Sequence, residues 1–82
     1  MQTIMIDGSR YTSSLELHQA LKRLLSLPDY YGMNADALND CLSERISPAN
    51  LWILDPGKGE VADSVRLIST VFADNGGTVK EL

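Results

Sequence analysis

The stretch LHQALKRLLSLPDYYGMNADALNDCL, residues 17–42, decides how this chain folds. Leucines and alanines in its first part recur at helical spacing, and Pro28 ends that helix because it disfavours helical backbone angles in the residue before it. Asn34 is a natural N-cap for a second helix, whose apolar side carries Leu38 and Leu42. The stretch therefore predicts two helices joined by a short loop.

Two aspartates stand one turn apart on the second predicted helix, which we place at residues 35–46, before Pro48. Asp36 and Asp40 are at positions i and i+4, so about 5–6 Å separates their Cβ atoms on one helix face. The opposite side carries the residues Leu38, Cys41, Leu42 and Ile46. We therefore expect that side to pack into the core and the aspartates to face water.

The spacing of these acids alone leaves two interpretations open. Asp36 occupies the second position of the helix, where the helix dipole stabilises a carboxylate for purely structural reasons. Asp40 lies beyond the first turn and is followed one turn later by Glu44, although like charges at this spacing destabilise a helix by a few tenths of a kcal/mol. A merely solvated face and a surface for a basic partner both agree with this pattern.

Short apolar runs on either side of this stretch predict strands. Residues 3–6 form a β-branched and apolar run that ends at Asp7-Gly8, which predicts an interior strand followed by a turn. Residues 51–54 form a continuous apolar run, the pattern of a strand buried on both faces. Residues 78–82 can form a last strand, and its charged Lys80-Glu81 pair favours an edge position.

The sequence also marks where the first and third helices begin and end. Ser13 and Glu16 match a capping box, so the first helix begins near Ser14, and it stops before Leu27. The third helix ends at residues 75–77, which contain two glycines. Its apolar stripe consists of Val61, Val65, Ile68 and Phe72.

The resulting order is strand, helix, helix, strand, helix, strand, and strands that alternate with helices form parallel sheets. We therefore expect an α/β fold with a small three-stranded parallel sheet packed with helices. The chain has 82 residues, of which 44% are hydrophobic, and this is the size and composition of one globular domain, residues 1–82.

The charge balance limits the possible partners. Seven lysines and arginines stand against eleven aspartates and glutamates, so the net charge is 7 − 11 = −4. The basic residues are scattered, which disfavours nucleic acid as a partner, and the acidic surface favours a basic protein. No segment has the pattern of a signal peptide or the length of a membrane span. We therefore expect no membrane interaction and a cytoplasmic location.

No residue cluster predicts catalysis, a metal site or a cofactor site. His18 is the only histidine and lies at the edge of an apolar stripe, so we expect it to be packed, and no nucleophile and base pair accompanies it. Cys41, the only cysteine, lies on the apolar side of its helix, which predicts a buried thiol. Gly57-Lys58-Gly59 lacks the spacing of a phosphate-binding loop. We therefore expect a binding protein and not an enzyme.

The stretch that decides the fold also resembles the barstar family of intracellular ribonuclease inhibitors. The residues that carry the resemblance are Leu17-His18-Gln19, Leu21-Lys22, Leu27-Pro28, Tyr30-Tyr31-Gly32, Asn34, Asp36-Ala37-Leu38 and Asp40. The resemblance implies the same α/β fold and an immunity protein of the bacterial cytoplasm. Such a protein would bind a small basic ribonuclease, barnase-like or a toxin domain, in a one-to-one complex and be a monomer when free. An acidic helix and the Tyr loop before it would occlude the active site by phosphate mimicry.

The resemblance further implies which residues bind the partner. Tyr30 would face the ribonuclease, Tyr31 would be more structural, and Asp40 would be the energetic centre. The implied contact residues are Tyr30, Gly32, Asn34, Ala35, Asp36, Asn39, Asp40 and Ser43. A second acidic contact maps onto Asp63, through the match of Ala62-Asp63-Ser64-Val65.

This sequence departs from the family pattern at the implied surface. Asn39 and Arg45 stand where barstar carries tryptophan, and Ala35 replaces a larger aliphatic residue. The surface is therefore less apolar than in the family pattern and partly basic at Arg45. The alternative function is accordingly a barstar-like interaction module that binds a different basic protein without inhibiting a ribonuclease.

Overall fold

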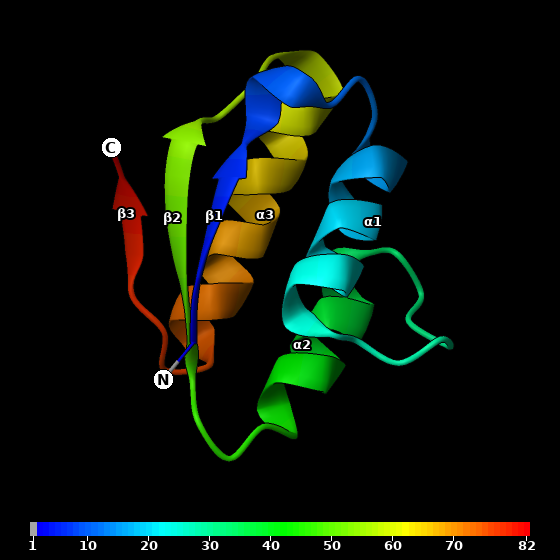
Figure 1. Ribbon diagram of the computed structural model, residues 1–82, viewed down its shortest axis with the longest axis vertical. Helices are drawn as coiled ribbons and strands as arrows, with labels where there is room; N and C mark the ends of the chain where they lie inside the picture. The colour runs from blue at the N-terminus through cyan, green and yellow to red at the C-terminus, as the bar shows by residue number, and fades with distance from the viewer. Residues whose placement is uncertain (1) are drawn as a thin grey trace.

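The computed structural model describes residues 2–82, in which three helices cover one face of a three-stranded parallel sheet (Figure 1). The elements are β1 (Gln2–Asp7), the short 3-10 helix η1 (Gly8–Arg10), α1 (Ser14–Leu25), α2 (Ala35–Ser43), β2 (Ala49–Asp55), α3 (Gly59–Asp74) and β3 (Val79–Glu81). The predicted α/β class and the predicted order of strands and helices are confirmed. The turn predicted after β1 takes the form of the short 3-10 helix η1.

The sheet has the order β1-β2-β3, with Ile4 beside Leu51 and Leu51 beside Val79. β2 is the central strand. The segment with α1 and α2 connects it to β1 on one side, and α3 connects it to β3 on the other. The prediction that residues 3–6 form an interior strand is therefore wrong, since β1 is an edge strand. The predicted edge position of the last strand is confirmed.

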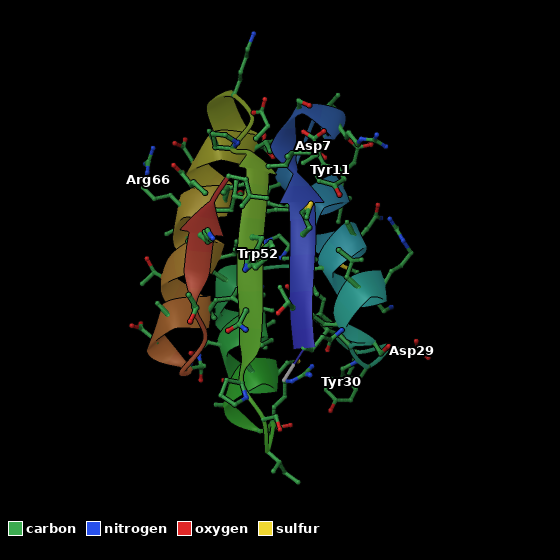
Figure 2. The ribbon with its side chains drawn as sticks, turned by 60° about the vertical axis from the view of Figure 1, so that its left-hand side comes forward. Asp7, Tyr11, Asp29, Tyr30, Trp52 and Arg66 are labelled. Atoms are coloured by element: carbon green, nitrogen blue, oxygen red, sulfur yellow. The ribbon has the colours of Figure 1, made fainter. Side chains whose placement is uncertain are left out.

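The face of the sheet that points away from the helices is open to solvent (Figure 2). On β2, Leu51 and Ile53 are buried, whereas the side chains between and after them, Trp52 and Leu54, are 36% and 53% exposed. Met5 on β1 is also half exposed. The prediction that residues 51–54 are buried on both faces is thus wrong. A continuous apolar run is typical of a sheet covered on both sides, and here the helices share one side.

The core lies between the helices and the covered face of the sheet. Leu17 and Leu21 from α1, Leu38 from α2 and Ile68 and Phe72 from α3 are completely buried. They pack with the inward-facing residues of the strands, Ile4, Ile6, Leu51 and Ile53. The predicted apolar stripe of the third helix is confirmed, because every one of its members is buried in this core.

Helix α1 begins and ends as predicted. The Ser13 hydroxyl accepts a hydrogen bond from the Glu16 amide at 3.2 Å, which is the first half of the predicted capping box. The Glu16 carboxylate instead accepts from the amide and the hydroxyl of Thr12, at 2.7 and 2.6 Å. These hydrogen bonds lower the pKa of Glu16. The helix stops at Leu25, because the next residue, Ser26, has a left-handed backbone with φ of 53°.

Helix α2 is shorter than predicted and ends at Ser43 instead of residue 46. The chain must turn there to enter β2, and Arg45 stabilises the turn by donating to the Gln2 side chain at 2.8 Å and to the Ser47 carbonyl at 3.4 Å. Ile46 lies outside the helix and is fully exposed, so the prediction that it belongs to the apolar side of the helix is wrong. None of the helices within residues 2–82 has the length and apolar content needed to cross a bilayer.

Two neighbouring aliphatic residues of α3 test this arrangement. Ile68 is completely buried and Leu67 is 59% exposed. Ile68→Ala should lower the free energy of unfolding by about 2–5 kcal/mol, because it leaves a cavity in the core. Leu67→Ala should change it by less than about 0.5 kcal/mol. Urea denaturation of both variants measures the difference, and equal effects would contradict the burial described here.

Candidate partner-binding surface

The two adjacent tyrosines of the loop between α1 and α2 point in opposite directions. Tyr30 is 82% exposed (Figure 2). Tyr31 is 4% exposed and belongs to the core. A rigid aromatic side chain that the fold leaves in solvent is a good anchor for a partner. Tyr31 therefore belongs to the fold, whereas contact of Tyr30 with a partner stays a prediction.

A buried hydrogen bond fixes this loop to α1. The Tyr31 hydroxyl lies 2.6 Å from His18 Nδ1, and both side chains are nearly inaccessible to water. Burial lowers the pKa of His18 and raises that of Tyr31, so both groups are neutral at pH 7, and the hydroxyl can donate to an unprotonated Nδ1. It also lies 3.4 Å from the Asn34 carbonyl, at the start of α2. His18 is thus packed, as predicted, and links α1 to the loop and to α2.

The start of α2 is rigid because Asn34 uses both ends of its side chain. Its Oδ1 accepts from the Ala37 amide at 2.8 Å, which confirms the predicted N-cap. Its Nδ2 donates to the Gly32 carbonyl at 3.0 Å. A Cβ on Gly32 would lie 3.2 Å from the Ala37 Cβ, so the loop and the helix are in close contact here. Both Gly32 and Asn34 therefore serve the shape of this surface, in addition to any contact they make with a partner.

The exposed face of α2 carries negative charge that the rest of the described chain does not neutralise. Asp36, Asp40 and Glu44 are exposed, and no ion pair within residues 2–82 involves any of them. Asp36 lies in the first turn, as predicted, whereas Asp40 and Glu44 lie beyond it. Ala35 is half-buried, and the exposed Ser43 donates its hydroxyl to the Asp40 carbonyl at 2.9 Å. The face is therefore acidic and without internal partners.

Tyr30 and the acidic face border the same hollow. A shallow cavity of about 200 Å³ is lined by Tyr30, Gly32, Asp40, Cys41 and Glu44, among others. Cys41 is half-buried in it, where the sequence predicted a buried thiol. Burial raises the pKa of the Cys41 thiol, and the charges of Glu44 and Asp40 raise it further. The thiol is thus held in its neutral, weakly nucleophilic form.

The two positions at which the family pattern has tryptophan, Asn39 and Arg45, have structural partners. Asn39 accepts a hydrogen bond from Asn75 Nδ2 at 2.9 Å, and the same nitrogen donates to the Val71 carbonyl at 2.8 Å. This contact joins the exposed side of α2 to the C-terminal end of α3. Arg45 is half-buried and directs its guanidinium to Gln2, so its charge is held at the turn into β2.

The contact between Asn39 and Asn75 brings the C-terminal end of α3 to the acidic helix, whereas the predicted contact residue Asp63 lies near the other end of α3. Asp63 lies near the start of α3 and pairs with Arg66 at 3.5 Å. Along the helix axis, about 18 Å separates it from Asn75, at 1.5 Å per residue. The exposed Asp74 directly precedes Asn75. The sequence does not single out Asp74, because only the packing of α2 against α3 reveals which end of α3 lies beside the acidic helix.

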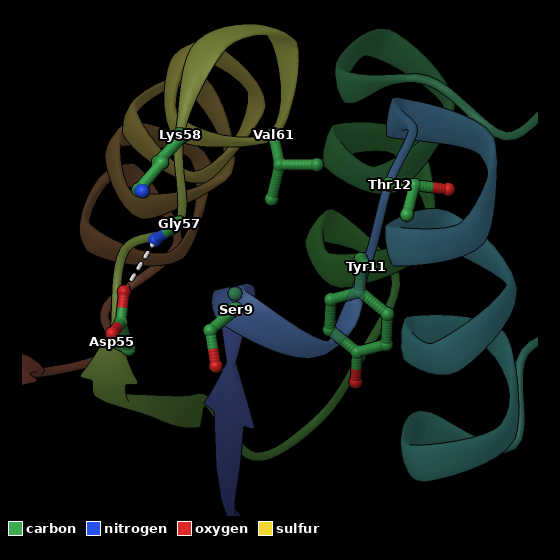
Figure 3. Close-up of a pocket in the computed structure, with 8 residues that line it drawn as sticks. Ser9, Tyr11, Thr12, Asp55, Gly57, Lys58 and Val61 are labelled. Carbon is green, nitrogen blue, oxygen red and sulfur yellow. Dashed lines mark hydrogen bonds between the residues drawn. The ribbon is translucent and has the colours of Figure 1, made fainter.

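Another hollow lies at the carboxyl ends of β1 and β2, where open parallel sheets commonly bind ligands (Figure 3). It measures about 400 Å³. The hydroxyls of Ser9 and Thr12 donate to Asp7 and Glu16, and Asp55 accepts from the Gly57 amide at 2.8 Å. Most of its polar side chains are thus already engaged within the protein. No group of three or more His, Cys, Asp or Glu side chains in residues 2–82 is arranged to hold a metal ion.

The fold and this surface define a small α/β protein that presents an acidic helix and an exposed aromatic loop. The family model described as Barstar (barnase inhibitor) matches residues 1–72, and the chain belongs to this family. A protein of Bacillus subtilis (strain 168) named "Putative ribonuclease inhibitor YrdF" is 51% identical over 43 residues. That match covers 52% of this chain and 47% of the relative, so it spans about half of each.

The buried histidine predicts a pH dependence of stability. Above about pH 6.5, the ordinary pKa of histidine, His18 is neutral in both the folded and the unfolded chain and contributes no pH dependence. Below that pH the unfolded chain binds a proton that the folded protein resists, because burial lowers the pKa of His18. The free energy of unfolding should therefore fall as the pH decreases from 6.5 toward 5, by at most about 1.4 kcal/mol per pH unit.

His18→Gln is the matched control for this prediction, because glutamine can accept from Tyr31 but does not titrate. The variant also leaves every other ionisable group of the protein in place, so the difference between the two profiles reports on His18 alone. Urea denaturation between pH 5 and 7.5 should thus show a slope for the parent and a flatter profile for the variant. Parallel profiles would contradict the role given to His18.

Proposed function

We propose that this protein inhibits a small basic ribonuclease by covering its active site with the Tyr30 loop and α2. The observation that carries the proposal is the exposure of Asp36, Asp40 and Glu44 without ion pairs in residues 2–82. Asp40 and Glu44 also border the hollow next to Tyr30. Like charges one turn apart destabilise the free helix. A basic partner offsets this repulsion, which supports a binding role. Membership of the barnase inhibitor family and the name of the relative support a ribonuclease as that partner.

The mechanism follows from the chemistry of a ribonuclease site. Such a site binds a scissile phosphate through cationic side chains, and a carboxylate can replace the phosphate oxygens through charge-assisted hydrogen bonds. We assign this role to Asp40, since it lies in the middle of α2 and beside Tyr30 in the same hollow. Tyr30 then acts as the aromatic anchor. The inhibitor does no chemistry and blocks access to the site in a one-to-one complex.

The other residues of the proposed surface shape it or extend it. Gly32 and Asn34 hold the loop against α2, Asn39 connects α2 to α3, and Ala35, Asp36 and Ser43 complete the exposed side of the helix. We place the acidic contribution of α3 at Asp74 in preference to Asp63, because Asn75 contacts α2. We expect the free protein to be a monomer in the bacterial cytoplasm.

A specific observation favours a second candidate function, an interaction module for a different basic protein. Asn39 is held by Asn75, and Arg45 is turned to Gln2, so neither position supplies an apolar contact like the tryptophans of the family pattern. A panel of small basic ribonucleases from bacteria, barnase-like enzymes and toxin domains included, separates the two functions. Inhibition of one panel member at equimolar inhibitor supports the proposal, and binding without loss of ribonuclease activity supports the alternative.

Asp40→Ala tests the proposed centre of the surface. Asp40 has no ion pair within residues 2–82, so the free energy of unfolding should stay unchanged or rise slightly as repulsion is relieved. Binding to the inhibited ribonuclease should weaken by about 2–5 kcal/mol, since a covered cationic group loses its partner. Glu81→Ala removes the same charge from β3 and should leave the inhibition constant almost unchanged. If Asp40→Ala inhibits as well as the parent, the proposed mechanism is wrong.

The charge of the surface predicts how fast the complex forms. Complementary charges steer two proteins together, and dissolved salt screens them over about 10 Å at 0.1 M ionic strength. Stopped-flow association rates should therefore fall steeply between 20 mM and 500 mM sodium chloride, while dissociation rates change much less. An association rate that does not depend on salt would indicate an apolar docking surface.

A further inference from the structure

The outer edge of β1 is unpaired and carries neither a lysine nor a proline, although its register with β2 shifts between Ile6 and Asp7. β1 pairs with β2 on one side, and within residues 2–82 no backbone hydrogen bond reaches its other edge. Exposed edges are commonly blocked by lysines, by prolines or by a very short strand. β3, at the opposite edge, has three residues and contains Lys80. β1 has six residues, QTIMID, with neither lysine nor proline.

An apolar notch runs beside this edge. Met5, Leu24 and Leu54 are 50%, 41% and 53% exposed, and together they line a cavity of about 310 Å³. Met5 lies next to Trp52 in the register of the sheet, so the apolar surface continues onto the open face (Figure 2). Three large apolar side chains from β1, α1 and β2 thus converge around one hollow beside the edge.

Cations surround this apolar surface although the protein as a whole is acidic. Arg10 and Arg23 line the notch and are exposed, and Lys80 lies over the Trp52 ring with its Nζ 5.3 Å from the centroid. Asp7, the carboxylate that lines the notch, accepts from the amide and the hydroxyl of Ser9 at 3.0 and 2.6 Å and lies 3.5 Å from Arg10. Arg23 has no ion pair within residues 2–82. Its charge is therefore available to a ligand.

We propose that the free edge of β1 and the notch lined by Met5, Leu24, Leu54, Arg10 and Arg23 dock an extended segment of a partner protein that alternates apolar and acidic side chains. Main-chain hydrogen bonds to β1 would supply affinity, as in other cases where a peptide extends a sheet. Apolar side chains of the segment enter the notch, and its carboxylates meet the arginines. This surface is separate from the acidic face of α2 and does not depend on the proposed ribonuclease inhibition.

A protein segment fits this surface better than a membrane or a second copy of the chain. The net charge of −4 opposes approach to an anionic bilayer, and an unpaired strand edge offers hydrogen bonds that lipid does not need. A stable interface between two copies buries about 1,200–2,000 Å². The notch and the edge of one six-residue strand are small for that purpose.

The single tryptophan of the chain, Trp52, reports on this surface directly. The probe is a capped hexapeptide that alternates glutamate and leucine, and its control alternates lysine and leucine. We expect saturable changes in Trp52 fluorescence with the acidic peptide and none with the basic one. Slower amide exchange at residues 3–6 should accompany binding. Equal binding of both peptides, or no binding at millimolar concentration, would overturn the proposal.

Reversing the charge of one exposed arginine on α1 and of another on α3 tests where the peptide binds. Arg23→Glu should weaken binding of the acidic peptide roughly threefold to tenfold, as expected for an exposed ionic contact. Arg66→Glu, on α3, makes the same charge change away from the notch and should have no effect (Figure 2). Asp40→Ala should also bind the peptide normally, which separates this site from the inhibitory surface.

Two further results would contradict the proposal. A shift of Trp52 emission with phosphatidylserine vesicles, but not with the peptide, would assign the surface to lipid. A dimer in sedimentation experiments that Arg23→Glu dissociates would assign it to a second copy of the chain.

Discussion

The helices α1, α2 and α3 bury their apolar sides against the same face of the sheet, and most other features of the molecule depend on this constraint. One covered face gives one core, in which Leu17, Leu38 and Phe72 meet the inward side chains of β1 and β2. It also leaves Met5, Trp52 and Leu54 on the opposite face in contact with water. Helix α2 packs against α3 on its apolar side, so its opposite side is exposed to solvent. The acidic surface is thus a consequence of how the core is closed.

The hydrogen bond between His18 and Tyr31 connects that core to the proposed binding loop. A buried polar pair contributes modestly to stability when satisfied and becomes costly when one partner is lost. It therefore favours one arrangement of the loop over others. Tyr31 is fixed inward and its neighbour Tyr30 projects into solvent, and the Asn34 cap fixes the start of the helix that follows. In the proposed complex, Tyr30 and the acids of α2 would meet the partner already arranged, which would reduce the conformational entropy lost on binding.

Charge is distributed unevenly between two surfaces of the protein. The α2 face gathers acids without ion pairs in the described chain, whereas the β1 edge gathers Arg10 and Arg23 around apolar side chains. The net charge of −4 describes neither surface by itself. Two regions of opposite character on one small domain can address two different partners. Asn39 and Arg45 adapt the first region to the fold of this chain, since both are engaged by internal hydrogen bonds.

The sequence by itself determined the features that depend on local physics. Helix caps at Ser13 and Asn34, the end of α1 before Pro28 and the apolar stripe from Val61 to Phe72 are set by neighbouring residues. The apolar positions Leu38 and Leu42 likewise leave the acids of α2 on its other side. Only the tertiary structure decided what depends on distant segments. Packing between segments far apart in the chain sets four features. They are the edge position of β1, the open face at Trp52, the early end of α2 and the approach of Asn75 to Asn39. An apolar run has the same pattern whether one face or both are covered, and the covering elements are not encoded within the run itself.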